Sequence, residues 1–189
     1  MLYIYAINDK IFIILENQRL KNIIDDYLVK SDTIIAKVLS DKGSPFLRSI
    51  IINKGSKHKI KLGMVVMDEA YLVGKIVEVN YSSSRVLLLS DLNSKIPVIV
   101  EPNTVFSILS GTGKDYGVIQ YSKKYEDIKN ESVIYTSGAG SLFKAGIPIG
   151  RMNINNLSDE KKVDFFSDFS QLKFVKVVSF KKSENKWQG

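Results

Sequence analysis

Cysteine is absent from this chain of 189 residues, and histidine and tryptophan occur once each. The absence of cysteine excludes disulfide bonds, thiol nucleophiles and cysteine-type metal sites. The single histidine, His58, lies in the run GSKHKIK. Its position among lysines is typical of a solvated loop side chain. Because one histidine cannot build a histidine-rich metal site, we expect neither a metal nor any other cofactor.

Long apolar runs are also missing, since no stretch reaches the roughly 18 apolar residues that a transmembrane helix needs. The N-terminal run MLYIYAINDKIFIIL comes closest, but Asn8, Asp9 and Lys10 interrupt it. It also lacks the basic start and the small-residue cleavage site that mark a signal peptide. The residues themselves therefore predict neither a spanning helix nor an export signal.

No phosphate-binding motif is complete, although residues 136–151, TSGAGSLFKAGIPIGR, hold four glycines. The glycines do not have the spacing of a Walker loop. A dinucleotide fingerprint begins at Gly138 and Gly140, but Phe143 stands where the third glycine belongs. Pro148 and Gly150 favour an extended segment over the helix that would hold a phosphate. We interpret this stretch, like GTGKDYG at 111–117, as a turn-rich link between strands.

Catalytic arrangements are equally incomplete. A Ser-His-Asp triad would have to use His58, and no Gly-x-Ser-x-Gly run surrounds a serine. Ser141, which follows Gly-Ala-Gly, resembles the surroundings of a nucleophile only loosely. Acids such as Asp68, Glu69 and Asp91 lie beside predicted turns, where carboxylates are usually solvated. The sequence therefore predicts a protein that is not an enzyme and has no small-molecule substrate.

One helix is predicted, within residues 1–30. In the run IFIILENQRLKNIIDDYLVK, apolar residues recur at spacings of three and four, which is typical of one face of a helix. The helix either packs on its own domain or pairs with a second copy as a short coiled coil, and periodicity alone does not decide between these. The candidate self-association face comprises Ile13, Leu20, Ile23, Ile24 and Tyr27.

The rest of the chain favours β structure. Eleven short runs rich in β-branched residues recur at roughly ten-residue spacing, separated by turn residues, which predicts all-β barrels or a sandwich. Pro102 and Asn103 are turn residues that indicate a boundary between two halves. We therefore expect barrels at 31–102 and 103–180 and a mobile tail at 181–189. The predicted strands are 33–39, 48–53, 63–67, 71–79, 85–90, 95–101, 104–109, 117–121, 132–137, 147–154 and 172–180.

A faint internal repeat supports two similarly built halves. IKLGMVVM (60–67) followed by YLVGKIVEV (71–79) resembles IKNESVIY (128–135) followed by IPIGRMNIN (147–155). In this alignment Gly74-Lys75 corresponds to Gly150-Arg151, and Val65-Val66 to Val133-Ile134. We assign structural turn roles to five glycines: Gly74, Gly138, Gly140, Gly146 and Gly150.

The charge of the chain favours an anionic partner. Lysine and arginine number 27 against 20 acidic residues, a net charge of +7. One alternative function is therefore a basic all-β nucleic-acid binder, for which Tyr121 and Tyr125 on either side of Lys123-Lys124 provide a candidate stacking surface.

Taken together, the motifs resemble the MreC family of bacterial rod-shape-determining proteins. The resemblance runs through RSIIINKGS, LGMVV, LVGKIVEV and SSRVLLLSDLNSKIPV, then through TSGAGSLFKAGIPIGR and DFSQLKFVKVV, and covers about residues 31–178. Residues 129–132, Lys-Asn-Glu-Ser, depart from the family's glycine-containing turn, and VFSILS replaces a glycine-containing run at 105–111.

This resemblance implies a mainly β fold of two small tandem β-barrels preceded by an N-terminal α-helix that pairs with a second copy. It implies a non-enzymatic scaffold of the cell-wall elongation machinery that controls rod cell shape, at the periplasmic face of the inner membrane. The implied partners are MreD, MreB, RodA and the elongation-specific penicillin-binding transpeptidase. The resemblance also implies self-assembly, and it implies no nucleic-acid partner. The family normally has a membrane anchor and a longer coiled coil before the barrels, whereas here Met1 falls at or inside that region.

Overall fold

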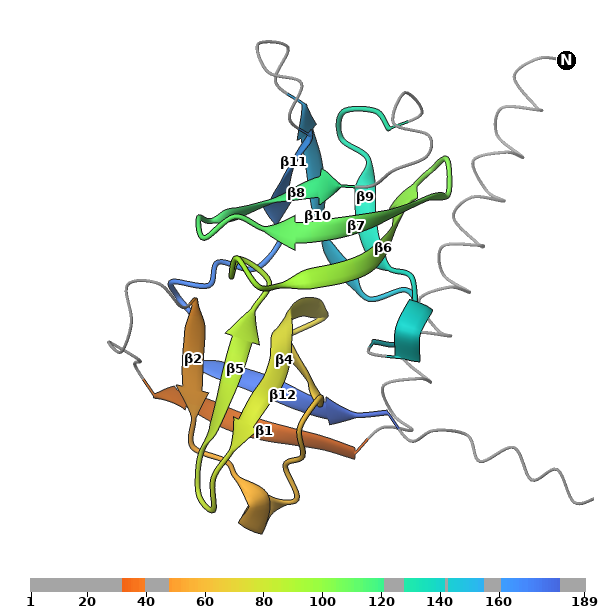
Figure 1. The fold of residues 1–189 in the computed structure, drawn as a ribbon. Helices are drawn as coiled ribbons and strands as arrows, with labels where there is room; N and C mark the ends of the chain where they lie inside the picture. Colours follow the sequence, from red (N-terminus) through yellow and green to blue (C-terminus); the bar gives the residue numbers. More distant parts are fainter. Residues whose placement is uncertain (1–31, 40–47, 121–127, 142, 155–160, 181–189) are drawn as a thin grey trace, which may run out of the picture.

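The computed structural model describes residues 32–39, 48–120, 128–141, 143–154 and 161–180. The helix predicted within 1–30, with all five residues of its candidate self-association face, lies outside the described residues, and so does the predicted tail at 181–189. Within the described ranges the chain is built from β-strands and short 3-10 turns (Figure 1). The prediction of a mainly β protein is therefore confirmed.

Twelve strands follow one another along the described chain. Their bounds are β1 (Asp32–Leu39), β2 (Ser49–Ile52), β3 (Val65–Asp68), β4 (Tyr71–Val79), β5 (Ser84–Leu88), β6 (Lys95–Glu101), β7 (Val105–Gly111), β8 (Tyr116–Gln120), β9 (Val133–Thr136), β10 (Pro148–Ile154), β11 (Lys161–Phe165) and β12 (Phe174–Ser179). Two 3-10 turns interrupt them, η1 (Ser56–His58) and η3 (Ala139–Ser141). Eleven of the twelve strands overlap predicted ones. Prediction missed β11, because its sequence KKVDF buries only Val163 fully and reads as a polar loop.

The strands close into two six-stranded antiparallel barrels, one below the other in Figure 1. The first has the circular order β1-β12-β3-β4-β5-β2, and the second β7-β6-β9-β10-β11-β8. The two orders are equivalent when β7 to β11 are matched to β1 to β5, with β6 taking the place of β12. The faint sequence repeat therefore reflects a repeated architecture.

The sixth strand of each barrel comes from the other half of the chain. Strand β6 follows the first five strands but pairs with β7 and β9 of the second barrel. Strand β12 follows the second five but closes the first barrel between β1 and β3. The expected division into 31–102 and 103–180 is wrong in this respect, since 95–101 belongs to the second barrel and 174–179 to the first. The chain crosses between barrels at 89–94, and Pro102 lies in a hairpin of the second barrel.

Two of the glycines predicted at turns instead lie inside strands, at equivalent places. Gly74 in β4 is opposite Val66, and Gly150 in β10 is opposite Ile134, as the repeat alignment predicts. A Cβ at Gly74 would overlap the carbonyl oxygen of Leu87 on the next strand, and a Cβ at Gly150 would overlap that of Asp164. Both positions require glycine because neighbouring backbones approach closely there.

The apolar core continues from one barrel into the other. Alternation along β3 points Val66 into the first barrel, while Val65 and Met67 point out of it. The outward pair belongs to a buried cluster that also contains Leu109 and Ile149 of the second barrel. Because β3 is buried on both faces, the two barrels are packed against each other through side chains.

Candidate partner-binding surface

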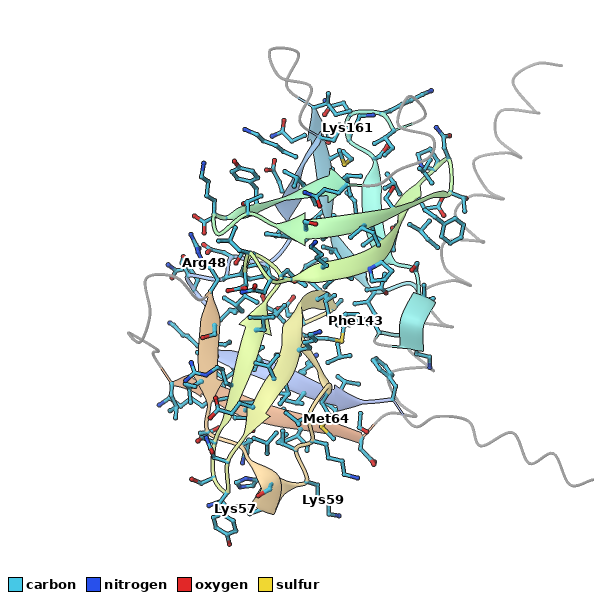
Figure 2. The ribbon with its side chains drawn as sticks, in the orientation of Figure 1. Arg48, Lys57, Lys59, Met64, Phe143 and Lys161 are labelled. Atoms are coloured by element: carbon cyan, nitrogen blue, oxygen red, sulfur yellow. The ribbon has the colours of Figure 1, made fainter. Side chains whose placement is uncertain are left out.

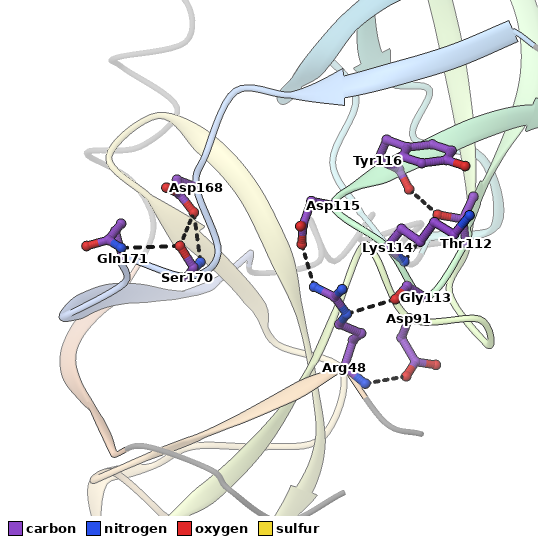
Figure 3. A network of polar contacts seen from close by, with 10 residues as sticks. All are labelled: Arg48, Asp91, Thr112, Gly113, Lys114, Asp115, Tyr116, Asp168, Ser170 and Gln171. Atoms are coloured by element: carbon purple, nitrogen blue, oxygen red, sulfur yellow. Dashed lines mark hydrogen bonds and ion pairs between the residues drawn. The ribbon is translucent and has the colours of Figure 1, made fainter. Parts of the chain in front are cut away.

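A polar network ties the barrels together beside this apolar junction (Figure 3). Arg48, which precedes β2 of the first barrel, reaches the β7–β8 hairpin of the second. Its Nε donates a hydrogen bond to the carbonyl oxygen of Gly113 at 2.9 Å, and its guanidinium forms an ion pair with Asp115. In the same hairpin, the Thr112 hydroxyl donates to the carbonyl oxygen of Tyr116 at 2.6 Å. The stretch GTGKDYG at 111–117 therefore forms a structural contact between barrels.

Asp91 is the buried centre of this network. Its side chain has no exposed surface, yet it accepts three hydrogen bonds. The backbone N–H of Arg48 donates to Oδ2 at 2.8 Å, and the backbone N–H and Nδ2 of Asn93 donate to Oδ1 at 2.8 and 3.0 Å. The prediction of a solvated acid at this position is wrong, because the carboxylate organises the crossing at 89–94.

The single histidine lies far from the barrel junction. His58 belongs to η1, at the end of the first barrel away from the second, where Figure 2 labels its neighbours Lys57 and Lys59. Its Nδ1 accepts a hydrogen bond from the backbone N–H of Gly55 at 3.3 Å. Partial burial, with a smaller contribution from Lys54 and then Lys57, lowers the pKa of His58. The histidine that a Ser-His-Asp triad would have to use therefore lies outside the junction between the barrels.

Two hollows in the described ranges differ in size and position. A cavity of about 10 Å³ between the barrels, beside Gly74 and Phe143, has room for a single water at most. An open hollow of about 530 Å³ lies on the first barrel, and its lining includes Val38, Ile50 and Phe174 together with Lys37 and Lys173. The described residues contain no group of three or more histidines or acids placed to hold a metal ion.

The glycine-rich stretch at 136–151 connects β9 to β10 and helps to fill the junction. Gly138, Gly140 and Gly146 have φ values of 75°, 73° and 87°, which side chains other than glycine rarely adopt. Between them the chain turns back so that Phe143, 6% exposed, packs into the cluster shared by the two barrels. The Thr136 hydroxyl accepts the N–H of Ile147 at 2.9 Å and thereby holds the base of this loop.

The outer face of the second barrel has a row of apolar side chains in register across three strands. Ile99 in the centre of β6 is directly opposite Phe106 of β7 on one side and Tyr135 of β9 on the other. Beside this row, Pro97 is opposite Ile108. Phe106 is 64% exposed, and its four neighbours are partly exposed. We call these five residues the apolar row.

Tyr135 is the polar member of the row. Burial, and to a lesser extent the negative charge of Glu101, raises the pKa of Tyr135, so the phenol stays neutral and can donate a hydrogen bond. An apolar face that ends in a phenolic donor has the composition that protein interfaces favour.

For protein partners, prediction named residues only for a self-association face on the N-terminal helix, and it did not single out this row. A signal was present, since KIPVIVE of β6 is apolar at both alternating sets of positions. Val98 and Val100 point into the barrel, so Pro97 and Ile99 must point outward. A strand that is apolar on both faces but borders solvent indicates a surface for a partner.

The fold thus defines a protein of two six-stranded antiparallel barrels that exchange their sixth strands. The family model described as "Rod shape-determining protein MreC, barrel core" matches residues 38–179. Cell shape-determining protein MreC of Caulobacter vibrioides is 32% identical over 146 residues, which cover 77% of this chain and 42% of the relative. The Haemophilus influenzae protein of the same description is 37% identical over 137 residues, 71% of this chain and 39% of the relative. This chain belongs to the MreC family, and it spans less than half the length of these relatives.

Solved structures agree with this assignment. The crystal structure of MreC from Pseudomonas aeruginosa has a TM-score of 0.72 at 27% identity, covering 78% of this chain and 99% of that one. A complex between a penicillin-binding protein (PBP2) and MreC from Helicobacter pylori has a TM-score of 0.59 at 14% identity, covering 79% of this chain and 99% of that one, and shares the fold. No helix in the described part of this chain is long and apolar enough to cross a membrane.

Proposed function

We propose that this protein is a non-catalytic scaffold of the machinery that elongates the bacterial cell wall, and that it binds the elongation-specific penicillin-binding transpeptidase through the apolar row. Family membership supports a role in cell shape. The Helicobacter pylori relative is known in complex with a penicillin-binding protein, which supports a transpeptidase as the partner. The observation that carries the proposal is the apolar row itself, an exposed apolar surface on a rigid barrel.

The geometry of the row fits protein docking. Side chains directly opposite each other on antiparallel strands have Cβ atoms about 4.5–5.5 Å apart. Phe106, Ile99 and Tyr135 therefore form one continuous strip across β7, β6 and β9. Their backbones are fixed by strand pairing on both sides of β6, so docking orders only side chains and loses little conformational entropy.

Phe106 is the anchor of this surface because its ring has the largest exposed fraction in the row, at 64%. Interface side chains that dominate binding cost about 2 kcal/mol or more when truncated, which is roughly thirtyfold in affinity. Replacing Phe106 by serine should weaken binding by about this factor. It should not affect folding, because the ring points to solvent.

The test is a titration of the full chain against the purified transpeptidase by surface plasmon resonance. Ile35→Ser is the matched control, since Ile35 has the same exposed fraction, 64%, but lies on β1 of the first barrel. We expect Phe106→Ser to weaken binding about thirtyfold and Ile35→Ser to bind as the unmodified chain does. Equal binding by Phe106→Ser and the unmodified chain would contradict the docking surface. If only Ile35→Ser lost binding to the transpeptidase, the docking surface would lie on the first barrel instead.

Three further features belong to the same proposal. The protein acts at the periplasmic face of the inner membrane, as the family resemblance implies, and one related structure is described as the major periplasmic domain of a filament. A second copy pairs with the helix face that includes Leu20 and Ile23, giving a homodimer or a larger assembly. MreD, MreB and RodA are the other partners in the machinery.

A further inference from the structure

The end of the first barrel opposite the second barrel concentrates positive charge. Four lysines, Lys54, Lys57, Lys59 and Lys61, occur within eight residues around η1. Three of them are exposed and Lys54 is partly exposed. Figure 2 labels Lys57 and Lys59 at the outer limit of this barrel. The two segments that form this end, 54–64 and 79–84, contain no aspartate or glutamate.

This charge is not neutralised within the part of the chain that the structure describes. None of the four lysines has a carboxylate partner there. Glu78 is the nearest acid along β4, and it is already held by Arg85 Nε at 3.1 Å and Asn80 Nδ2 at 3.4 Å. The lysines therefore present a net positive surface to solvent.

The backbone that presents these lysines is held in place. The N–H groups of Ser56 and Lys57 donate to the carbonyl oxygens of Asn80 and Tyr81, at 2.9 and 3.1 Å, and clamp η1 onto the β4–β5 hairpin. A side chain at Gly55 would overlap the carbonyl of Asn80, so the two segments are in direct backbone contact. Binding therefore requires little ordering of the main chain.

Two large apolar side chains project beside the lysines. Leu62 is 67% exposed in the turn that Met64 N–H closes onto the carbonyl oxygen of Lys61. Tyr81 is 74% exposed in the β4–β5 hairpin, with the Nζ of Lys57 lying 5.6 Å from its ring centre. We define the basic tip as Lys54, Lys57, Lys59, Lys61, Leu62 and Tyr81.

Lysines surrounding a leucine and a tyrosine are the combination that membrane interfaces favour. Lysine is attracted to anionic headgroups, tyrosine resides at headgroup level and an aliphatic side chain enters the acyl boundary. A soluble polyanion would use the lysines and could stack on Tyr81, but it offers no apolar environment for Leu62. We propose that the basic tip binds anionic phospholipid headgroups at a membrane surface, with Leu62 and Tyr81 inserted at the interface. This goes beyond the scaffold function and does not depend on it.

Vesicle sedimentation with the full chain tests this. The probes are phosphatidylcholine vesicles with and without phosphatidylglycerol. Each lysine close to an anionic surface should contribute roughly fivefold to partitioning, so Lys57→Ser combined with Lys59→Ser and Lys61→Ser should lower partitioning about a hundredfold. Leu62→Ser should also lower partitioning to anionic vesicles, and added salt should weaken binding by the unmodified chain.

A control variant removes lysines from another part of the surface. Lys114→Ser combined with Lys162→Ser removes two lysines that lie over Tyr116 on the second barrel, and it should bind vesicles nearly as the unmodified chain does. Urea midpoints equal to that of the unmodified chain establish that each variant is folded. Unchanged vesicle binding by the triple variant overturns the proposal. A Leu62→Ser variant with full binding, together with lysine-dependent binding of a labelled oligonucleotide, overturns it in favour of a soluble polyanion site.

Discussion

Replacing Asp91 by alanine should destabilise the protein more than any change to its exposed partners in the barrel junction. The carboxylate has no exposed surface and accepts three hydrogen bonds, from Arg48 and Asn93. A hydrogen bond to a charged group contributes about 1.5–3 kcal/mol, and a buried donor left unpaired costs about 1–3 kcal/mol. The Asn93 side chain is exposed and can turn to water, so mainly two backbone donors are orphaned. We expect a loss of about 2–4 kcal/mol.

Two further substitutions test whether the loss of stability comes from the hydrogen bonds of the buried carboxylate. Asp91→Asn keeps the shape and one acceptor oxygen, but it directs an amide donor at the N–H of Arg48, so it should cost about 1–2 kcal/mol. Asp115→Ala removes the ion pair with the same arginine, yet the Asp115 side chain is 89% exposed. An exposed pair of this kind contributes about 0–1 kcal/mol. The expected order of destabilisation is Asp91→Ala, then Asp91→Asn, then Asp115→Ala.

Urea unfolding followed by circular dichroism measures these differences. The midpoint should shift while the slope with urea stays constant, because the same surface is exposed on unfolding in each variant. If Asp91→Ala unfolds at the same urea concentration as Asp115→Ala, the carboxylate does not organise the crossing between barrels. A changed slope would instead indicate that the two barrels no longer unfold as one cooperative unit.

Other predictions follow from the strands, the histidine and the N-terminal face. Gly74→Ala and Gly150→Ala should each lower the thermal midpoint, because the added Cβ overlaps a neighbouring backbone carbonyl; a midpoint equal to the unmodified protein's would contradict this close approach. His58 should titrate below 6.5 by NMR, since burial and adjacent lysines disfavour its charged form. Because the pKa of His58 is lower in the folded protein than in the unfolded chain, the contribution of this group to stability is complete above about pH 6.5 and is lost as the pH falls through the folded pKa. An NMR titration midpoint of His58 at or above 6.5 would contradict this. Leu20→Asp with Ile23→Asp should convert a dimer to a monomer in light scattering, and a monomer before substitution would remove the pairing proposal.

Much of the local structure could be predicted from the sequence. A strand with one face inside a barrel must either alternate apolar and polar residues or be apolar throughout. That physical constraint placed β4 and β6 at their observed bounds. It failed at β11, where Val163 alone is fully buried and charged residues face solvent. The repeat was also readable, since Gly74 and Gly150 are needed wherever β4 and β10 meet a neighbouring carbonyl.

The candidate surfaces were harder to predict. The apolar row depends on β7, β6 and β9 lying side by side. Backbone hydrogen bonds between strands do not depend on which side chains the pairing brings together, so the sequence does not specify this arrangement. The burial of Asp91 likewise depends on Arg48, which is distant in sequence. Neither contact leaves a periodic signal along the chain.

By itself, the sequence determined the kind of protein: mainly β, internally repeated, without cysteine, and with the motif order of the MreC family. Only the tertiary structure decided which barrel each strand completes. Strands β6 and β12 each close the barrel of the other half. The physical reason is that alternation reports which face of a strand is buried, whereas the choice of neighbour is made by long-range pairing and by the shared core between the barrels.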